Sequence, residues 1–106
     1  SVDIFQDADN LYVLAPIAGV KPEKLDLVID RDVLTIRGER EKDLETSGKN
    51  YLYHECYWGK FSRSIILPLP VIGSKVKAAF KNGVLKVILP KAPEARSIGI
   101  KVQDEE

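Results

Sequence analysis

The chain has 106 residues, of which 44% are hydrophobic and 30% charged, and this balance fits one domain with a buried core. Lysine plus arginine and aspartate plus glutamate number 16 each, so no net field draws the protein to nucleic acid or anionic lipid. The apolar runs are short and interrupted by proline or lysine, which excludes a membrane-spanning helix. We therefore expect neither nucleic acid nor membrane among its partners.

The compartment is predicted from two features. Cys56 is the only cysteine, so no internal disulfide can form, which is typical of a reducing environment. No secretory leader is visible, and together these features predict a cytoplasmic protein. Because the chain begins at Ser1 without a methionine, we expect further residues before it in the natural protein.

The first 40 residues show short runs rich in Val, Ile, Leu, Tyr and Phe, separated by turn residues, a pattern typical of β-strands. Pro16 marks the end or the edge of the second run. A tight turn is expected at 31–32. The predicted strands are 1–6, 11–19, 25–30 and 33–40.

The second half begins with a long charged connection, 41–50, followed by an aromatic strand at 50–57. The strongest signal is Asn82-Gly83 between two alternating runs, because a type I′ hairpin turn needs positive φ at both central residues. Further strands are predicted at 60–70, 76–81 and 84–90. About eight strands without a helical period predict an all-β, two-sheet sandwich over 1–90, followed by a C-terminal extension, 91–106.

Catalytic and metal-binding chemistry is not expected. His54 and Cys56 share a strand face, but structural metal sites want about four ligands and the chain has no other His or Cys. No nucleophile turn, third orienting group or phosphate-binding glycine loop accompanies them. The sequence therefore predicts no enzyme, no cofactor and no small-molecule substrate.

Four motifs together carry a family resemblance. Residues 78–90 read A-x-x-x-N-G-V-L-x-V-x-L-P and are similar to the hallmark of small heat-shock proteins, whose core is the α-crystallin domain. Residues 14–40 resemble the bacterial and plant type, although that pattern usually has proline directly before glycine where this chain has Pro16-Ile17-Ala18-Gly19. The segment 59–68 resembles the strand with the family's characteristic arginine, and 98–100 resembles its C-terminal Ile-x-Ile motif. The hairpin signature comprises Asn82, Gly83, Val84 and Leu85.

The resemblance implies an immunoglobulin-like sandwich with a strand-bearing long loop, and ATP-independent binding of partly unfolded client proteins. It also implies a dimer in which the loop strand crosses to the partner's sheet. Arg63 would then pair with a carboxylate across the dimer. The exchanged residues would be Tyr51, Leu52, Tyr53, His54, Glu55 and Cys56. The alternative is an ordinary hairpin of this segment with 60–67.

The C-terminal tail carries Ile98, Gly99 and Ile100, whose two isoleucines point the same way in an extended chain. The resemblance implies that this motif docks on a neighbouring subunit and builds higher oligomers. Which face of each strand lines the docking groove is left open by the sequence. The expected walls are Leu25, Leu27 and Ile29 on one side and Val76, Ala78 and Phe80 on the other. The alternative is a final strand on the chain's own sheet.

Two other kinds of β-sandwich remain as rival interpretations. A monomeric p23-like co-chaperone would share the fold but lack the loop and the Ile-x-Ile tail. An extracellular adhesion domain would be expected to show a leader or paired cysteines, and neither is visible.

Overall fold

The computed structural model describes residues 1–42, 45, 47–95 and 100–104. Within this part the protein has seven β-strands and three single-turn 3₁₀ helices. The strands are β1 (Asp3–Gln6), β2 (Asn10–Pro16), β3 (Leu25–Asp30), β4 (Val33–Arg40), β5 (Gly59–Ile66), β6 (Lys77–Lys81) and β7 (Val84–Pro90). The 3₁₀ helices are η1 (Pro22–Lys24), η3 (Gly73–Lys75) and η4 (Pro93–Ala95).

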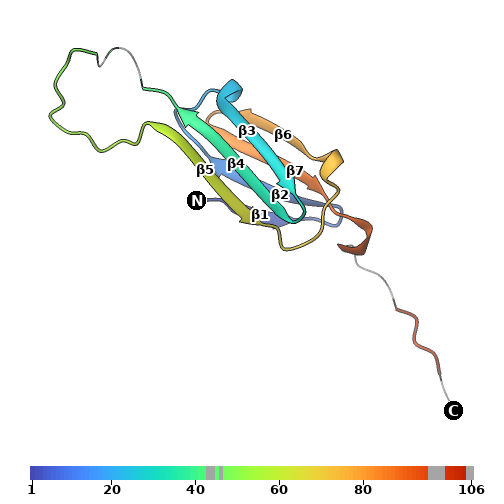
Figure 1. Ribbon diagram of the computed structural model, residues 1–106. Helices are drawn as coiled ribbons and strands as arrows, with labels where there is room; N and C mark the ends of the chain where they lie inside the picture. Colours follow the sequence, from blue (N-terminus) through green and yellow to red (C-terminus); the bar gives the residue numbers. More distant parts are fainter. Residues whose placement is uncertain (43–44, 46, 96–99, 105–106) are drawn as a thin grey trace.

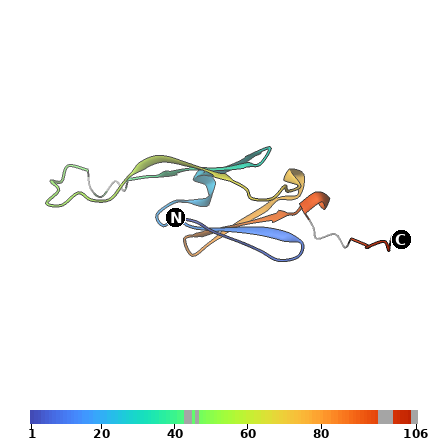
Figure 2. The same ribbon diagram turned by 90° about the horizontal axis from the view of Figure 1, so that it is seen from below.

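The strands form two antiparallel sheets that face each other, as the two layers in Figure 2 show. One sheet has the order β1-β2-β7-β6 and the other the order β3-β4-β5 (Figure 1). The prediction of an all-β, two-sheet sandwich is confirmed.

The core lies between the layers and is built by alternation. In β2, Leu11, Val13 and Ala15 are buried while their neighbours face outward. The same period of two recurs in β4 and β7, because successive strand residues point to opposite faces. Burying each large aliphatic side chain stabilises the fold by roughly 1.5–3 kcal/mol. The other buried members of the core are Ile17, Val20, Leu34, Ile36, Ile65, Leu67, Leu85, Val87 and Leu89.

Two tight turns set the register of the hairpins. Asn82 and Gly83 have φ of 53° and 77°, which is the positive φ that the type I′ turn needs, so the predicted hairpin is confirmed. Arg31 has φ of 59° in the turn between β3 and β4, where the sequence also predicted a turn. Both hairpins therefore form where the local sequence indicates.

The chain stays packed on the sandwich slightly beyond residue 90. Lys91 and Ala92 are both buried. The Lys91 N–H donates to the Asp9 carbonyl at 2.8 Å, and the Ala92 N–H donates to that of Pro70 at 2.9 Å. The division into a domain at 1–90 and an extension from 91 remains a prediction.

The aromatic segment differs from its sequence prediction. Residues 49–58 form no strand, although a strand was predicted at 50–57. A strand needs a neighbouring edge, and this segment does not pair with β5 in the single chain, so the hairpin alternative is absent there. Instead, the loop between β4 and β5 projects from one end of the sandwich (Figures 1 and 2).

Candidate functional site

The sandwich has two open sides, and each is bounded by two edge strands, one from each sheet. The strand order leaves β1 and β6 at the edges of one sheet and β3 and β5 at the edges of the other. An edge strand presents unpaired backbone N–H and C=O groups, to which another chain can add. The two open sides are therefore the parts of the sandwich at which another chain could add by backbone pairing.

The side between β3 and β6 carries the residues predicted to line a groove. Leu27 lies opposite the buried Ile36, and Phe80 lies opposite the buried Leu85, so the inner faces of both edge strands carry these side chains. An added Cβ on Gly73 would lie 3.7 Å from Ile29 Cγ2, which places the segment before β6 beside the end of β3. We name this set the β3/β6 strip: Leu25, Leu27, Ile29, Val76, Ala78 and Phe80.

The strip lies at the margin of the core. Five of its members are partly buried against the core cluster, and only Ala78 is exposed. The inner faces thus contribute to the core and reach solvent at the open side at the same time. The inner face of each edge strand is therefore the apolar one, and its use as a docking groove remains a prediction.

The opposite side, between β1 and β5, carries Arg63. Arg63 lies opposite the buried Ile36, so it stands on the inner face of an edge strand, yet it is exposed. It lines a hollow that Val2, Ile17 and Phe61 also line. An inward-pointing charge is a recognised way to keep an edge strand from pairing indiscriminately. Within the part of the chain that is described, Arg63 has no ion-pair partner.

The same side exposes apolar groups along β1. Ile4 and Phe5 line a second hollow together with Leu11 and Leu69. The side chains of Ile4 and Phe5 are both substantially exposed, although Ile4 lies opposite the buried Val13. This free edge is thus flanked by apolar surface that the single chain leaves uncovered.

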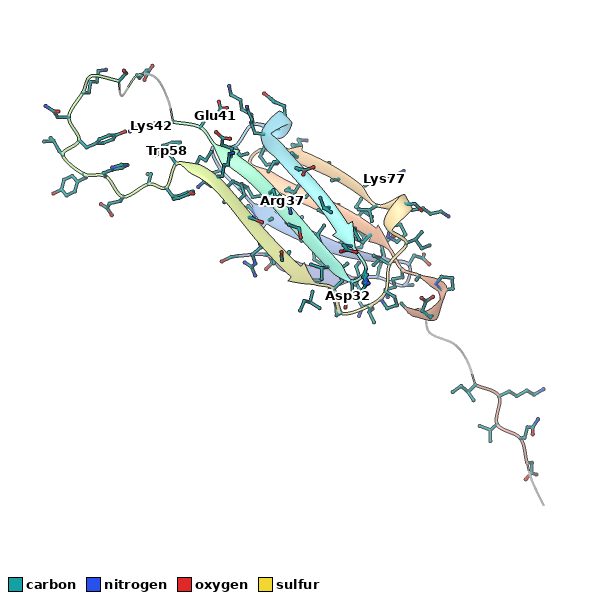
Figure 3. All side chains as sticks on the ribbon, in the orientation of Figure 1. Asp32, Arg37, Glu41, Lys42, Trp58 and Lys77 are labelled. Carbon is teal, nitrogen blue, oxygen red and sulfur yellow. The ribbon has the colours of Figure 1, made fainter. Side chains whose placement is uncertain are left out.

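The loop between β4 and β5 contains the residues predicted for strand exchange. Leu52 is 94% exposed and Tyr53 85% exposed. The Tyr51 ring stacks on His54 with centroids 4.4 Å apart, and Lys42 Nζ lies 4.4 Å from the Tyr51 centroid. The free Cys56 is also exposed. Figure 3 shows the loop, with Lys42 and Trp58 at its base, extending beyond the end of the sandwich, and in the described part of the chain no strand pairs with residues 49–58.

The base of this loop is held by Arg40, a residue that we did not single out from sequence. Its Nε donates to the Ala18 carbonyl at 2.8 Å, its Nη1 donates to that of Tyr57 at 3.4 Å, and its guanidinium lies 5.7 Å from the Phe61 ring centroid. The sequence did hold one signal for this role. Arg40 is four residues after Ile36, and residues an even number apart in a strand point to the same face, so Arg40 shares the inward face of Ile36. Arg40, at the start of the loop, thus links the end of the loop at Tyr57 to the segment after β2 at Ala18.

A surface ion pair adds to the loop base. Lys24 Nζ lies 3.0 Å from Glu41 Oε1. The hydrogen bond from Lys24 and its charge lower the pKa of the Glu41 carboxyl, and the same contact raises the pKa of Lys24. Because both side chains are more than two-fifths exposed, water screens the pair and its contribution to stability is small.

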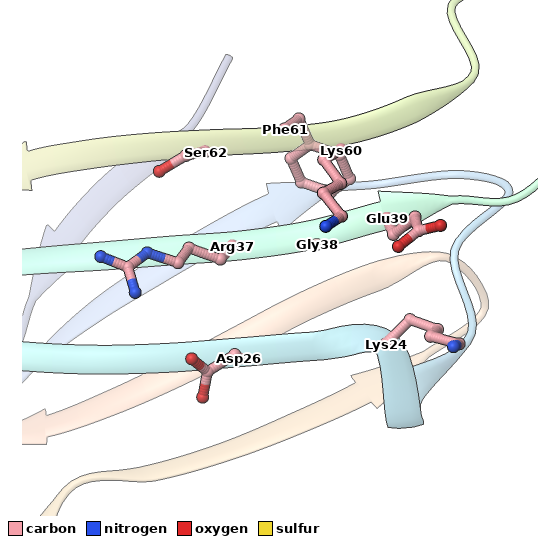
Figure 4. Close-up of a pocket in the computed structure, with 8 residues that line it drawn as sticks. All are labelled: Lys24, Asp26, Arg37, Gly38, Glu39, Lys60, Phe61 and Ser62. Atoms are coloured by element: carbon pink, nitrogen blue, oxygen red, sulfur yellow. The ribbon is translucent and has the colours of Figure 1, made fainter.

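A shallow hollow on the outer face of the three-stranded sheet has no catalytic arrangement. It is lined by side chains of alternating charge around Gly38 (Figure 4). Its charged residues, Lys24, Asp26, Arg37, Glu39 and Lys60, are typical of a solvated sheet surface. Among the described residues, no group of three or more His, Cys, Asp or Glu could hold a metal ion.

The tail was predicted to carry a docking motif. Ile98 and Gly99 lie outside the described residues. Ile100 is 88% exposed and Val102 is 89% exposed, and residues 100–104 form no strand.

In the described residues, no helix has the length and hydropathy needed to cross a membrane.

The chain matches the Hsp20/alpha crystallin family over residues 3–103. It belongs to this family. The predicted resemblance is thereby confirmed, and the Asn82–Leu85 signature forms the β6–β7 turn and the start of β7. The chain is 37% identical over 100 residues to small heat shock protein C4 of Rickettsia felis, covering 94% of this chain and 61% of that protein.

Two solved structures extend the similarity to the fold. Heat shock protein 16.0 from Schizosaccharomyces pombe matches with a TM-score of 0.79 and 30% identity, covering 99% of this chain and 96% of that chain. The hspA protein of Xanthomonas axonopodis matches with a TM-score of 0.76 and 31% identity, covering 88% and 93%. The chain spans somewhat over three fifths of the length of the first curated relatives, at 61% and 64%.

Proposed function

We propose that this protein is an ATP-independent chaperone that binds partly unfolded proteins and prevents their aggregation. The observation that carries the proposal is the concentration of exposed apolar side chains on two projecting segments, in a chain of the Hsp20/alpha crystallin family. Apolar surface of this kind binds the apolar surface that an unfolding protein exposes. The work requires no catalytic group, cofactor or small-molecule substrate, and neither nucleic acid nor a membrane takes part.

We further propose that the protein dimerises by strand exchange. Residues 50–57 of one copy would pair with the free edge of β1 in a second copy, where Ile4 and Phe5 are exposed. Pairing there would satisfy backbone groups of both segments and cover apolar area on each. Arg63, on the same open side, would find a carboxylate of the second copy.

Higher oligomers would form through the tail. Ile98 and Ile100 of one copy would dock on the β3/β6 strip of another. Burying two isoleucines is worth roughly 3–6 kcal/mol. Ordering the tail costs about 1–2 kcal/mol per residue, so a single contact is weak and reversible. Many such contacts within one assembly reinforce one another through effective concentration.

The protein would act in the cytoplasm, where its one exposed cysteine stays reduced. A monomeric p23-like module is the less favoured reading, because the projecting aromatic loop and the apolar tail have no role in it. Oligomeric state separates the two readings directly.

The decisive experiment follows thermal aggregation of a model client protein by light scattering, with and without ATP. We expect suppression at stoichiometric ratios that is independent of ATP, and weaker suppression by the Ile98→Ala/Ile100→Ala variant. Client aggregation that proceeds unchanged in the presence of the native protein contradicts the proposed activity.

Strand exchange is tested by sedimentation at micromolar concentration. We expect Leu52→Asp/Tyr53→Asp to shift the protein from dimer toward monomer. Ile66→Asp is the matched control, because Ile66 is 74% exposed on β5 but lies outside the loop. A monomeric native protein, or equal behaviour of the two variants, contradicts exchange through this segment.

A further inference from the structure

The tail carries a third aliphatic side chain that the Ile-x-Ile motif leaves out. Val102 follows Ile100 by two residues and is equally exposed. Residues two apart point the same way in an extended chain, so an extended tail would place Ile98, Ile100 and Val102 on one face and Lys101 on the other. Polar residues follow at Gln103 and Asp104, which ends the apolar alternation.

The β3/β6 strip has the same count and spacing. On β3, three apolar side chains stand two residues apart at Leu25, Leu27 and Ile29, on the inner face that the register defines. The opposite wall repeats this spacing at 76, 78 and 80. Each wall spans four residue steps, roughly 13 Å in an extended strand, which is the length from residue 98 to residue 102 of an extended tail.

The two walls run in opposite directions, so their ends face each other in pairs. Figure 1 shows β3 and β6 pointing opposite ways, and a Cβ added to Gly73 would lie 3.7 Å from Ile29 Cγ2, which places the start of one wall beside the end of the other. The middle position of one wall is Ala78, which is small and exposed. Two isoleucines would cover only two of the three positions along this strip.

From this match we propose that Val102 is a docking residue, so that the tail of one copy binds the strip of a second copy at three points. This inference rests on the proposed docking of the tail. It adds a consequence for specificity: a two-point plug can sit on a three-position strip in two registers, whereas a three-point plug has one register that fills every position. Val102 therefore sets the register.

The test uses a fluorescently labelled peptide of residues 96–106 and full-length protein with Ile100→Asp in its own tail, which leaves the strip free. Binding is measured by fluorescence anisotropy. We expect Val102→Ala in the peptide to weaken binding about tenfold, the change produced by losing one buried aliphatic side chain. Lys101→Ala is the matched control on the opposite face and should change affinity less than about twofold, as an exposed charge does.

The possible results separate this inference from the docking proposal. If Val102→Ala binds like the native peptide while Ile98→Ala binds more weakly, docking stands and the third contact is overturned. If Ile98→Ala and Val102→Ala each bind normally and only the peptide with both substitutions binds weakly, Ile98 and Val102 occupy the strip alternately in a two-point register. That result also overturns the third contact. If the native peptide does not bind at all, both the docking proposal and the third contact are wrong.

Discussion

Replacing Arg40 with alanine tests whether one side chain holds the base of the projecting loop. The substitution removes the hydrogen bonds to the carbonyls of Ala18 and Tyr57, which come from segments 22 and 17 residues away in sequence. It also removes the guanidinium from the face of Phe61. We expect both a loss of stability and greater opening of the loop.

The magnitude follows from these contacts. A hydrogen bond that involves a charged group contributes about 1.5–3 kcal/mol, and partial exposure brings the pair toward the lower end. The cation–π contact adds about 0.5–1 kcal/mol at an exposed site. We therefore expect Arg40→Ala to lower the free energy of unfolding by about 2 kcal/mol, which corresponds to roughly 8–16 °C in Tm at 4–8 °C per kcal/mol.

Urea denaturation at one fixed protein concentration measures this change, because self-association would otherwise contribute to apparent stability. Amide hydrogen exchange then reports whether residues 17–20 and 49–58 open faster. Arg37→Ala is the control, since Arg37 lies on the outer face of the same strand. Equal stability and equal exchange in the two variants would refute the role assigned to Arg40.

Two further substitutions test local contacts. A Cβ on Gly38 would lie 2.4 Å from Phe61 Cζ, so Gly38→Ala should cost about 1–3 kcal/mol in urea denaturation through overpacking, and adding Phe61→Leu should restore part of it. Hydrogen bonds from the Tyr12 hydroxyl and from backbone N–H groups lower the pKa of Asp7, so its ionised form stabilises the fold above the unfolded-state pKa. Asp7→Asn should therefore slightly lower Tm at neutral pH, and the difference should vanish as pH falls through the folded-state pKa; a difference that persists in acid contradicts this.

The strands and hairpins were predictable because they depend on short-range signals. Alternation with a period of two marks β3, β4 and β7, and Asn82-Gly83 can supply the two positive φ values of a tight hairpin. These signals are read within a few residues of sequence. The two-sheet sandwich then follows, since strands with one apolar face must bury that face against another sheet.

The candidate site was less predictable because it depends on which strands become edges. Alternation groups Leu25, Leu27 and Ile29 on one face but does not say that β3 lies at an open side, where that face is half covered. The role of Arg40 at the loop base was not predicted, because its partners Ala18 and Tyr57 offer backbone carbonyls, which every residue has. The segment predicted as a strand at 50–57 has the side chains of a strand, but it pairs with none of the edge strands that its own chain leaves free.

The placement of the two projecting segments bears on the order of assembly. The loop leaves one end of the sandwich and the tail leaves the other (Figures 1 and 2). Their proposed targets also differ, because β1 and the β3/β6 strip lie on opposite open sides. Strand exchange can therefore form a dimer while both strips stay accessible, and reversible tail contacts can join dimers without opening them. Weakening the tail should then change the size of the assembly and leave the dimer intact.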